Sequence, residues 1–189
     1  LLEASKASSG VLNVIPAPCE VGVLLEQVQG EYAERLHAHD LNLIVQTQDK
    51  TLTVLADGRH LGRIFDNLMN NIIKYAQPGT RVYLDARAGL DPAAPGGSRP
   101  VAVITFRNVS AEPLNIPAEE LLERFVRGDA SRHTEGSGLG LAIVQSLTEL
   151  QGGSLQLAID GDLFKVRLTF PLYTPADAAQ AASSGKATP

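Results

Sequence analysis

The chain has 189 residues, of which 44% are hydrophobic and 20% are charged, an ordinary balance for a globular domain with one good core. Its formal net charge of −5 does not favour duplex nucleic acid as a general partner, and its single cysteine, Cys19, excludes an internal disulfide. No run approaches the roughly 20 apolar residues that a membrane-spanning helix needs.

The first third of the chain predicts one helix between extended segments. Leu1–Gly10 has the pattern of the last turns of a helix with a glycine stop, and the Pro-punctuated stretch after it is predicted to be extended. Strands are predicted at Leu41–Gln46 and Thr51–Ala56, where apolar residues alternate. A helix is predicted over Cys19–His39, because apolar residues recur there at helical spacing: Val21, Leu25, Val28, Tyr32 and Leu36.

A long helix is predicted from Asp57, a good N-cap residue, to about Gln77, where Pro78-Gly79 ends it. Its apolar side is formed by Leu61, Ile64, Phe65, Leu68, Ile72 and Tyr75. Its other side is a continuous polar stripe: His60, Arg63, Asn67, Asn71 and Lys74. Asparagine is a poor helix former, costing roughly half a kcal/mol relative to alanine. The stripe is either a solvated face or a site whose amide oxygens hold a hard cation or orient phosphate.

The second half of the chain predicts more strands. Two are expected at Thr80–Leu90 and Val101–Asn108, and a short helix over Pro117–Phe125 precedes a polar, mobile segment, Arg127–Glu135. Asp160-Gly161-Asp162 joins two alternating runs, Gly153–Ile159 and Leu163–Phe170, and therefore predicts a β-hairpin. Ala-rich and Ser-rich residues from Thr174 onward predict a disordered tail.

Between the mobile segment and the hairpin lies a glycine run, Gly136-Ser137-Gly138-Leu139-Gly140-Leu141, that opens a helix with Leu139, Ile143, Leu147 and Leu150 as its apolar stripe. Free N–H groups and the positive end of the helix dipole gather at such a start, and glycines let an anion approach the backbone. The spacing G-x-G-x-G is neither the dinucleotide fingerprint nor a P-loop. The run is a phosphate-binding loop of another kind or a hinge before a packed helix.

The element order indicates the fold class. Three helices against a mixed sheet of five or six strands make a two-layer α/β sandwich. A ligand between the polar stripe and the glycine run would meet amides, one lysine and a helix N-terminus, which suits a metal-bound polyphosphate.

Three motifs in this order resemble those of a known family. Asn67 to Tyr75 (NLMNNIIKY) looks like the N box, N-x-x-x-N-x-x-K-[YF], of the GHKL ATPases. Glu123 to Arg132 is similar to the F-box segment of bacterial sensor histidine kinases, and Gly136 to Leu141 matches their glycine box. The F-box segment favours the histidine kinases over the gyrase, mismatch-repair and chaperone branches.

The resemblance implies a Bergerat-type sandwich that binds ATP and Mg²⁺ under a mobile lid. Asn67 and Asn71 would hold magnesium and phosphates, Lys74 would contact phosphate, and Tyr75 would help to wall the nucleotide pocket. The remaining implied contacts are Phe125 and Arg127 in the lid and, in the glycine box, Gly136, Gly138, Leu139 and Gly140, the glycines presenting their backbone to the phosphates.

One stretch departs from the family pattern. The family has an aspartate that accepts a hydrogen bond from the adenine amino group, within D-x-G-x-G. Asn108-Val109-Ser110-Ala111-Glu112 stands in its place, so that Asn108 replaces the aspartate and both glycines are missing. An asparagine oxygen still accepts a hydrogen bond, although more weakly than a carboxylate.

The resemblance also implies the protein's context. Residues 11–172 would be the ATP-binding catalytic domain, residues 1–10 the end of a preceding helical dimerisation and phosphoacceptor domain, and residues 173–189 the tail. The domain would transfer the γ-phosphoryl group of Mg-ATP to a histidine of that helical domain, upstream of this chain. Its partners would be the helical domain, a second copy in the full-length homodimer and a response regulator, with no nucleic acid. Its place would be the cytoplasmic side of an inner or plasma-membrane sensor protein.

Other readings stay open. The altered stretch at Asn108 favours a catalytically weak pseudokinase that senses nucleotide or acts as a scaffold. A GHKL protein-serine kinase or conformational ATPase is a further alternative. His37 and His39 lack the additional ligands of a zinc site. Asp66 could assist as a base, but it points about 100° away from Asn67 on the helix, which favours a structural or solvated role.

Overall fold

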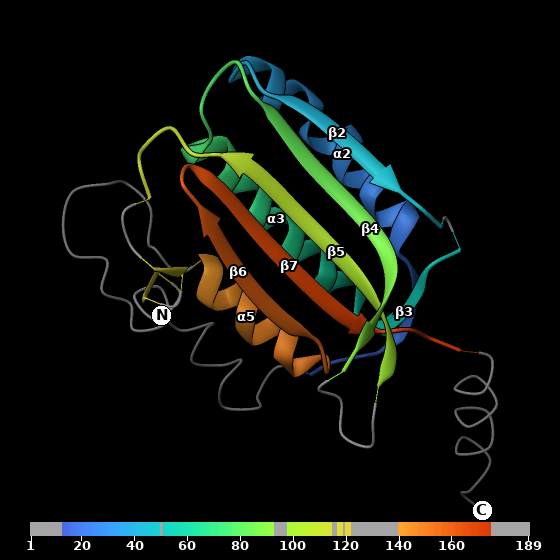
Figure 1. The fold of residues 1–189 in the computed structure, drawn as a ribbon. Coiled ribbons are helices and arrows are strands. Elements are labelled where there is room, and N and C mark those ends of the chain that lie inside the picture. Colours follow the sequence, from blue (N-terminus) through green and yellow to red (C-terminus); the bar gives the residue numbers. More distant parts are fainter. Residues whose placement is uncertain are drawn as a thin grey trace, which may run out of the picture.

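The computed structural model describes residues 13–49, 51–92, 98–114, 117–118, 120–121 and 140–174. Five strands form one mixed sheet, in the order β2-β4-β5-β7-β6. Their bounds are β2 Asn42–Thr47, β4 Arg81–Asp91, β5 Arg99–Val109, β6 Ser154–Asp160 and β7 Leu163–Pro171. Three helices cover one face of this sheet (Figure 1): α2 Val21–Ala38, α3 Gly58–Tyr75 and α5 Gly140–Leu150. The predicted two-layer α/β sandwich is confirmed.

The strand directions explain why α3 lies in the chain between two strands that are neighbours in the sheet. β2 and β4 are parallel, whereas the β4–β5, β5–β7 and β6–β7 pairs are antiparallel. Parallel neighbours need a crossover connection, and the chain between β2 and β4 contains α3. The helix that carries the N-box motif is therefore part of this crossover.

One predicted strand lies outside the main sheet. β3 (Thr53–Ala56) pairs antiparallel with β1 (Ala17–Glu20) in a separate two-stranded sheet. The mixed sheet therefore has five strands, the lower of the two numbers predicted, because β3 forms as a strand but lies outside it. A single bridge from Val54 to Leu172 ties this small sheet to the end of β7.

The core lies between the helices and the inner face of the sheet. Side chains alternate along each strand, so that one set faces the helices. Val82 and Leu84 of β4 and Ile104 of β5 are fully buried in this set. The rings of Phe65 on α3 and Phe106 on β5 meet with centroids 5.6 Å apart. This packing holds α3 flat on the sheet and fixes the direction of its polar stripe.

The helix ends are close to the prediction. Asp57 caps α3, as predicted, by accepting a hydrogen bond from the Arg59 backbone N–H. The helix ends at Tyr75, two residues early, and Tyr75 is 41% exposed rather than buried. The hairpin is confirmed, with Gly161 at φ +60° between β6 and β7.

The predicted apolar stripe of α5 was partly wrong. Ile143 and Leu150 are only partly buried. The helix instead buries Leu141, Ala142, Val144, Leu147 and Thr148. The prediction started the period at Leu139, which lies outside the described residues, whereas the buried face of the described helix starts at Leu141.

Several predictions lie outside the described residues. They are the helix end at residues 1–10, the polar segment at 127–135 and the tail from residue 175 onward. Of the helix predicted over 117–125, the structure describes four residues, with a turn in which the Leu121 N–H donates to the Pro117 carbonyl at 3.0 Å.

Candidate functional site: the N-box helix and the start of α5

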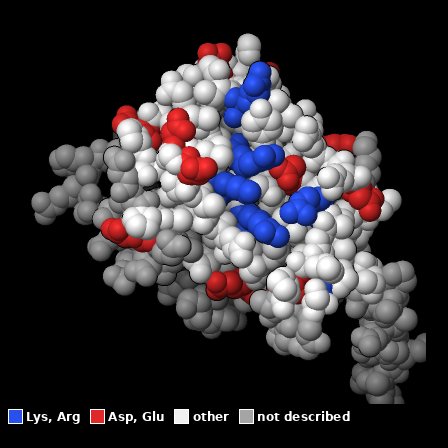
Figure 2. Space-filling view, in the orientation of Figure 1, with Lys and Arg blue, Asp and Glu red and all other residues white. Residues whose placement is uncertain are grey.

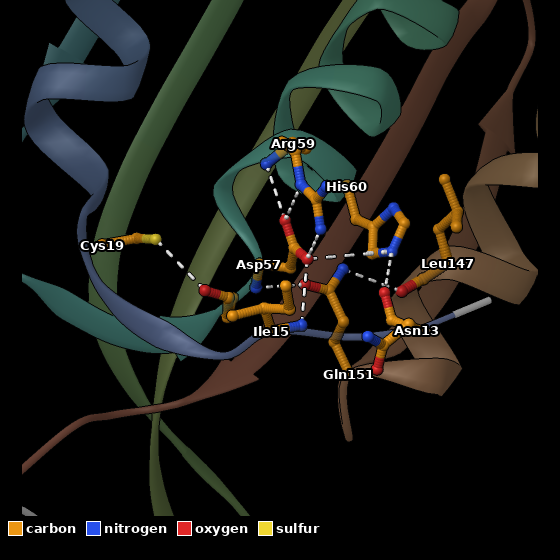
Figure 3. A network of polar contacts seen from close by, with 9 residues as sticks. Asn13, Ile15, Cys19, Asp57, Arg59, His60, Leu147 and Gln151 are labelled. Atoms are coloured by element: carbon orange, nitrogen blue, oxygen red, sulfur yellow. Dashed lines mark hydrogen bonds and ion pairs between the residues drawn. The ribbon is translucent and has the colours of Figure 1, made fainter.

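Asp57 anchors the first turn of α3 (Figure 3). The residue is 2% exposed, and its carboxylate accepts hydrogen bonds from the Ile15 N–H at 3.0 Å and from Arg59 Nη2 at 2.8 Å. The Arg59 side chain, then the Ile15 N–H, hold the pKa of Asp57 well below its usual range. The carboxylate thus stays ionised and ties the incoming chain to α3.

The same turn is joined to α5. Gln151 Oε1 accepts from the Asp57 N–H at 2.8 Å, and Gln151 Nε2 donates to the Leu147 carbonyl at 2.9 Å. His60 lies beside them, with Nε2 3.4 Å from the Asn13 carbonyl oxygen. The C-terminal end of α5 is therefore held against the N-terminal end of α3, which fixes how the two helices run past each other.

Because of that packing, the start of α5 faces the middle of α3. A Cβ atom added at Gly140 would lie 3.4 Å from Asn67 Oδ1 and 3.4 Å from both side-chain amide atoms of Asn71. Asn67 Nδ2 donates to the Arg63 carbonyl at 2.7 Å. The structure thus brings together three predicted site residues, Asn67, Asn71 and Gly140, and the polar stripe faces α5 at this point rather than only solvent.

The neighbouring polar residues of α3 face the other way. Asn70 Oδ1 accepts from Arg35 Nη2 of α2 at 2.8 Å. Asp66 accepts from the Tyr32 hydroxyl at 2.9 Å, which is the structural one of the two roles predicted for it. Burial, followed by the hydrogen bond to Asp66, raises the pKa of Tyr32 to about 12. One side of α3 therefore binds α2 through polar contacts, and the other presents amides to α5.

The end of α3 carries Lys74 and Tyr75, both exposed. The Lys74 ammonium lies 4.9 Å from the centre of the Tyr75 ring, within cation–π range. Lys74 is three positions after Asn71, so both lie on neighbouring turns of one face. A cation and an aromatic ring thus continue the amide row toward the end of the helix.

Asn108 lies near the end of β5 and is 4% exposed. Its Nδ2 donates to the Val109 carbonyl at 3.1 Å, which orients the side-chain amide. This end of β5 is joined to the end of α3, because the Gln77 N–H donates to the Val109 carbonyl and the Ala111 N–H to the Tyr75 carbonyl, each at 2.9 Å. Asn108 therefore belongs to the same end of the site as Tyr75.

The position of the first missing glycine is also tightly held. Ser110 is 8% exposed, and its N–H donates to the Asp162 carbonyl of the hairpin turn at 2.7 Å. A bridge pairs it with Ala76. A side chain is thus accommodated where the family pattern has glycine.

Phe125, Arg127, Gly136, Gly138 and Leu139 lie outside the described residues.

Sequence reasoning missed Gln151. Its contact with Asp57 joins residues 94 positions apart, and no local pattern signals it.

Known proteins resemble this chain in sequence. The family described as histidine kinase-, DNA gyrase B-, and HSP90-like ATPase matches residues 56–174. The signal transduction histidine-protein kinase BaeS of Escherichia coli K12 is 30% identical over 158 residues, which cover 82% of this chain and 32% of BaeS.

Solved structures share the fold. The catalytic domain of histidine kinase ThkA superimposes with a TM-score of 0.68 at 19% identity, covering 83% of this chain and 95% of that domain. Full-length ShkA, solved in complex with AMPPNP, gives a TM-score of 0.71 at 23% identity, covering 92% of this chain and 34% of ShkA.

The chain therefore belongs to the GHKL ATPase family. Within that family it is a catalytic domain of the sensor histidine kinase type, the kind that the F-box and glycine-box motifs predicted. It spans about a third of the length of the curated relatives it matches. In the described ranges, no helix is both long enough and apolar enough to cross a bilayer.

Proposed function

We propose that this domain binds Mg-ATP between α3 and α5 and donates the γ-phosphoryl group to a histidine of a helical domain outside this chain. The observation that carries the proposal is the meeting of Asn67 and Asn71 with Gly140, within 3.4 Å of a Cβ position. Glycine leaves room there that any other side chain would fill. Two amide groups next to a helix N-terminus form an arrangement suited to phosphate oxygens.

The donor set fits magnesium. Amide oxygens are hard ligands, and Mg²⁺ needs only one or two protein ligands because phosphates and waters complete its octahedron. Asn67 and Asn71 would hold the ion against the phosphates. When bound, the ion neutralises charge that develops on the phosphoryl oxygens.

The other residues would position the nucleotide. Lys74 would contact phosphate, Tyr75 would wall the base pocket, and Asn108 would accept from the adenine amino group. Phe125 and Arg127 of the lid, and Gly136, Gly138 and Leu139 beside Gly140, complete the proposed set. In the transfer, the bond between the γ-phosphorus and the β,γ-bridging oxygen breaks, a phosphorus–nitrogen bond forms, ADP leaves, and the imidazole loses a proton. Positioning and charge neutralisation supply most of the catalysis of such a loose transition state.

The partners follow from the same proposal. The helical domain would carry the acceptor histidine and the dimer contact, and a response regulator would receive the phosphoryl group from it. The parent protein would be a membrane sensor with this domain on the cytoplasmic side. These statements rest on the sensor kinases that resemble the chain.

A second candidate is a pseudokinase that senses nucleotide or acts as a scaffold. The specific observation in its favour is the stretch from Asn108 to Ser110. A neutral amide replaces the carboxylate there, and Ser110 is fixed by the hairpin turn. The adenine end of the site would then bind weakly while the phosphate end remains intact.

Calorimetric titration with ATP and with ADP, with and without magnesium, tests the proposal. We expect magnesium-dependent binding with a Kd of about 1–500 μM. Asn71→Ala should weaken it at least about 100-fold, since it removes an amide from the phosphate end. Asn70→Ala is the matched control, because that amide faces Arg35 on the opposite side of α3, and its affinity should stay near that of the wild type.

An absence of ATP binding would have two explanations, and a measurement on a longer chain distinguishes them. If ATP does not bind at about 5 mM, the adenine end is disabled or needs the helical domain. Recovery of binding when upstream sequence is restored would retain the kinase proposal, and phosphotransfer to the histidine would then be measured. Continued failure would favour the pseudokinase.

A further inference from the structure

The face of the sheet that the helices leave open carries a cluster of cations. Figure 2, in the orientation of Figure 1, shows blue Lys and Arg side chains gathered in the middle of this face. They come from three adjacent strands and line a groove of about 280 Å³: Arg87 of β4, Arg107 of β5, and Lys165 and Arg167 of β7. We call this set, with the adjoining Asp85 and Thr105, the basic groove.

The strand register explains the cluster. Arg107 is directly opposite Lys165, and Thr105 is directly opposite Arg167. Residues that face each other across antiparallel strands point to the same side of the sheet, and like charges directly opposite are destabilising. The sequence places four cations and a single carboxylate, Asp85, in this groove, although the whole chain carries a net charge of −5. Repulsion between these cations destabilises the sheet, and a bound anion would relieve it. The cluster is therefore better explained as a site for an anionic partner than as an ordinary surface.

Arg107 is held in place and is still partly accessible. Arg107 Nη2 pairs with Asp85 Oδ1 at 2.6 Å, and its guanidinium lies 5.2 Å from the centre of the Tyr83 ring. The Arg107 side chain is 35% exposed. The Nε atoms of Arg107 and Arg167 are buried, so a partner in the groove would meet the terminal nitrogens of the guanidinium groups instead. A guanidinium fixed by a carboxylate and a ring loses little freedom when it binds a second carboxylate.

We propose that the basic groove docks an acidic segment of a partner protein, one that presents aspartate or glutamate side chains. Asp85 shows that a carboxylate is a suitable ligand for Arg107. Arginine and tyrosine are enriched in protein interfaces, and Gln46 and Gln48 add polar groups at the rim of the groove. The groove lies on the opposite side of the sheet from α3 and α5, so a partner there would leave the nucleotide site open.

A peptide-binding measurement tests this proposal. A labelled poly-glutamate peptide of about ten residues, long enough to cross the sheet when extended, should bind the chain with a Kd of tens to hundreds of micromolar, and more weakly as salt is raised. Joint substitution of Lys165→Gln and Arg167→Gln should weaken it at least about tenfold. The control, Arg35→Gln with Arg99→Gln, removes the same charge from exposed positions outside the groove and should leave affinity within about twofold.

Two further arms keep the result decisive. Arg87→Glu, on an exposed side chain, reverses one charge of the groove and should weaken the peptide as well, which covers the case in which the double variant does not fold. Inorganic triphosphate and a short DNA duplex are titrated in parallel. If either binds through the groove while the peptide does not, or if nothing binds at about 1 mM, the proposal of an acidic protein partner is overturned. Mg-ATP affinity should be the same in the groove variants, so failure here is distinct from failure of the nucleotide site.

Discussion

The two halves of α3 show how one helix serves two purposes. At its N-terminal end, all the hydrogen bonds described for Asp57 are made within the fold. Its carboxylate accepts from the N–H groups of Ile15 and Arg59, and its own N–H donates to Gln151. In its C-terminal half, Asn67 and Asn71 are turned toward Gly140, and Lys74 and Tyr75 are exposed. In the first arrangement the polar groups bond to other groups of the protein, which stabilises the fold; we call it the closed end of the helix. The second leaves amides directed at the start of another helix, as a binding site requires.

The largest effect should come from the closed end. Asp57→Ala removes a helix cap and the charged acceptor of Ile15 and Arg59, and should lower the free energy of unfolding by about 3 kcal/mol. Mg-ATP affinity, measured well below the melting temperature, should change by less than about threefold. Urea unfolding and calorimetry together would show this. A folded variant that no longer binds nucleotide would contradict the inference that the N-terminal end of α3 stabilises the fold while only its C-terminal half binds nucleotide.

Acid should act on the same residue. The folded-state pKa of Asp57 is lowered, so its contribution to stability is present above the unfolded pKa of about 3.9 and is lost as pH falls through the folded-state value. The wild type should therefore lose more stability than Asp57→Ala below about pH 4.

The next effect should appear at the open half. Gly140→Ala places a methyl group 3.4 Å from the side-chain amides of Asn67 and Asn71, where it competes with phosphate for room. We expect Mg-ATP to bind about tenfold more weakly, equivalent to about 1.4 kcal/mol, with no loss of thermal stability, since alanine favours helix. Unchanged affinity would show that the approach of these residues has no part in binding.

A smaller effect concerns the polar contact between α2 and α3. Tyr32 has a folded-state pKa of about 12, above its ordinary value of about 10, so the folded protein keeps this proton through a range where the unfolded chain loses it. Stability should therefore fall as pH rises between these values. Tyr32→Phe should cost about 1 kcal/mol at neutral pH and flatten that fall. An unaltered alkaline slope would argue against the Tyr32 hydroxyl as its source.

The smallest effect is a control within the same helix. Apart from its chain neighbours and the nearby backbone of its own helix, no described atom lies within 4 Å of a Cβ added at Gly62. Gly62→Ala should raise stability by about 0.7 kcal/mol through helix propensity and leave nucleotide affinity unchanged. Comparison with Gly140→Ala then separates the backbone effect of losing a glycine from the steric effect at the site. A loss of affinity in Gly62→Ala would remove that separation.

Local signals were sufficient for much of the fold. The Asp57 cap and the Asp-Gly turn depend on residues close in the chain, and the sequence predicts both. The strand β1 was not predicted: Ala17 and Pro18 were expected only to be extended, and the assignment of Cys19 and Glu20 to the following helix was wrong. This four-residue, Pro-containing segment becomes a strand through pairing with β3, more than thirty positions away. The helical period placed Asn67 and Asn71 on one face, and the family resemblance pointed that face toward the glycine run.

Long-range contacts set the limit on what could be predicted. The Asp57–Gln151 clamp and the basic groove both depend on which strands and helices become neighbours. Lys165 and Arg167 alternate visibly in the sequence, but only the register of β5 and β7 places them beside Arg107. Tyr75 was assigned to the core by its spacing, and the early end of α3 exposes it.

The parallel pairing of β2 and β4 has a consequence for how binding and unfolding are linked. α3 lies in the crossover between these strands and buries Leu61, Ile64 and Phe65, so it cannot leave its place without exposing the core against the sheet. Opening the nucleotide site by detaching α3 would therefore be nearly as costly as global unfolding. Nucleotide bound between α3 and α5 would then raise the melting temperature of the whole domain by mass action, in addition to suppressing local opening of the site.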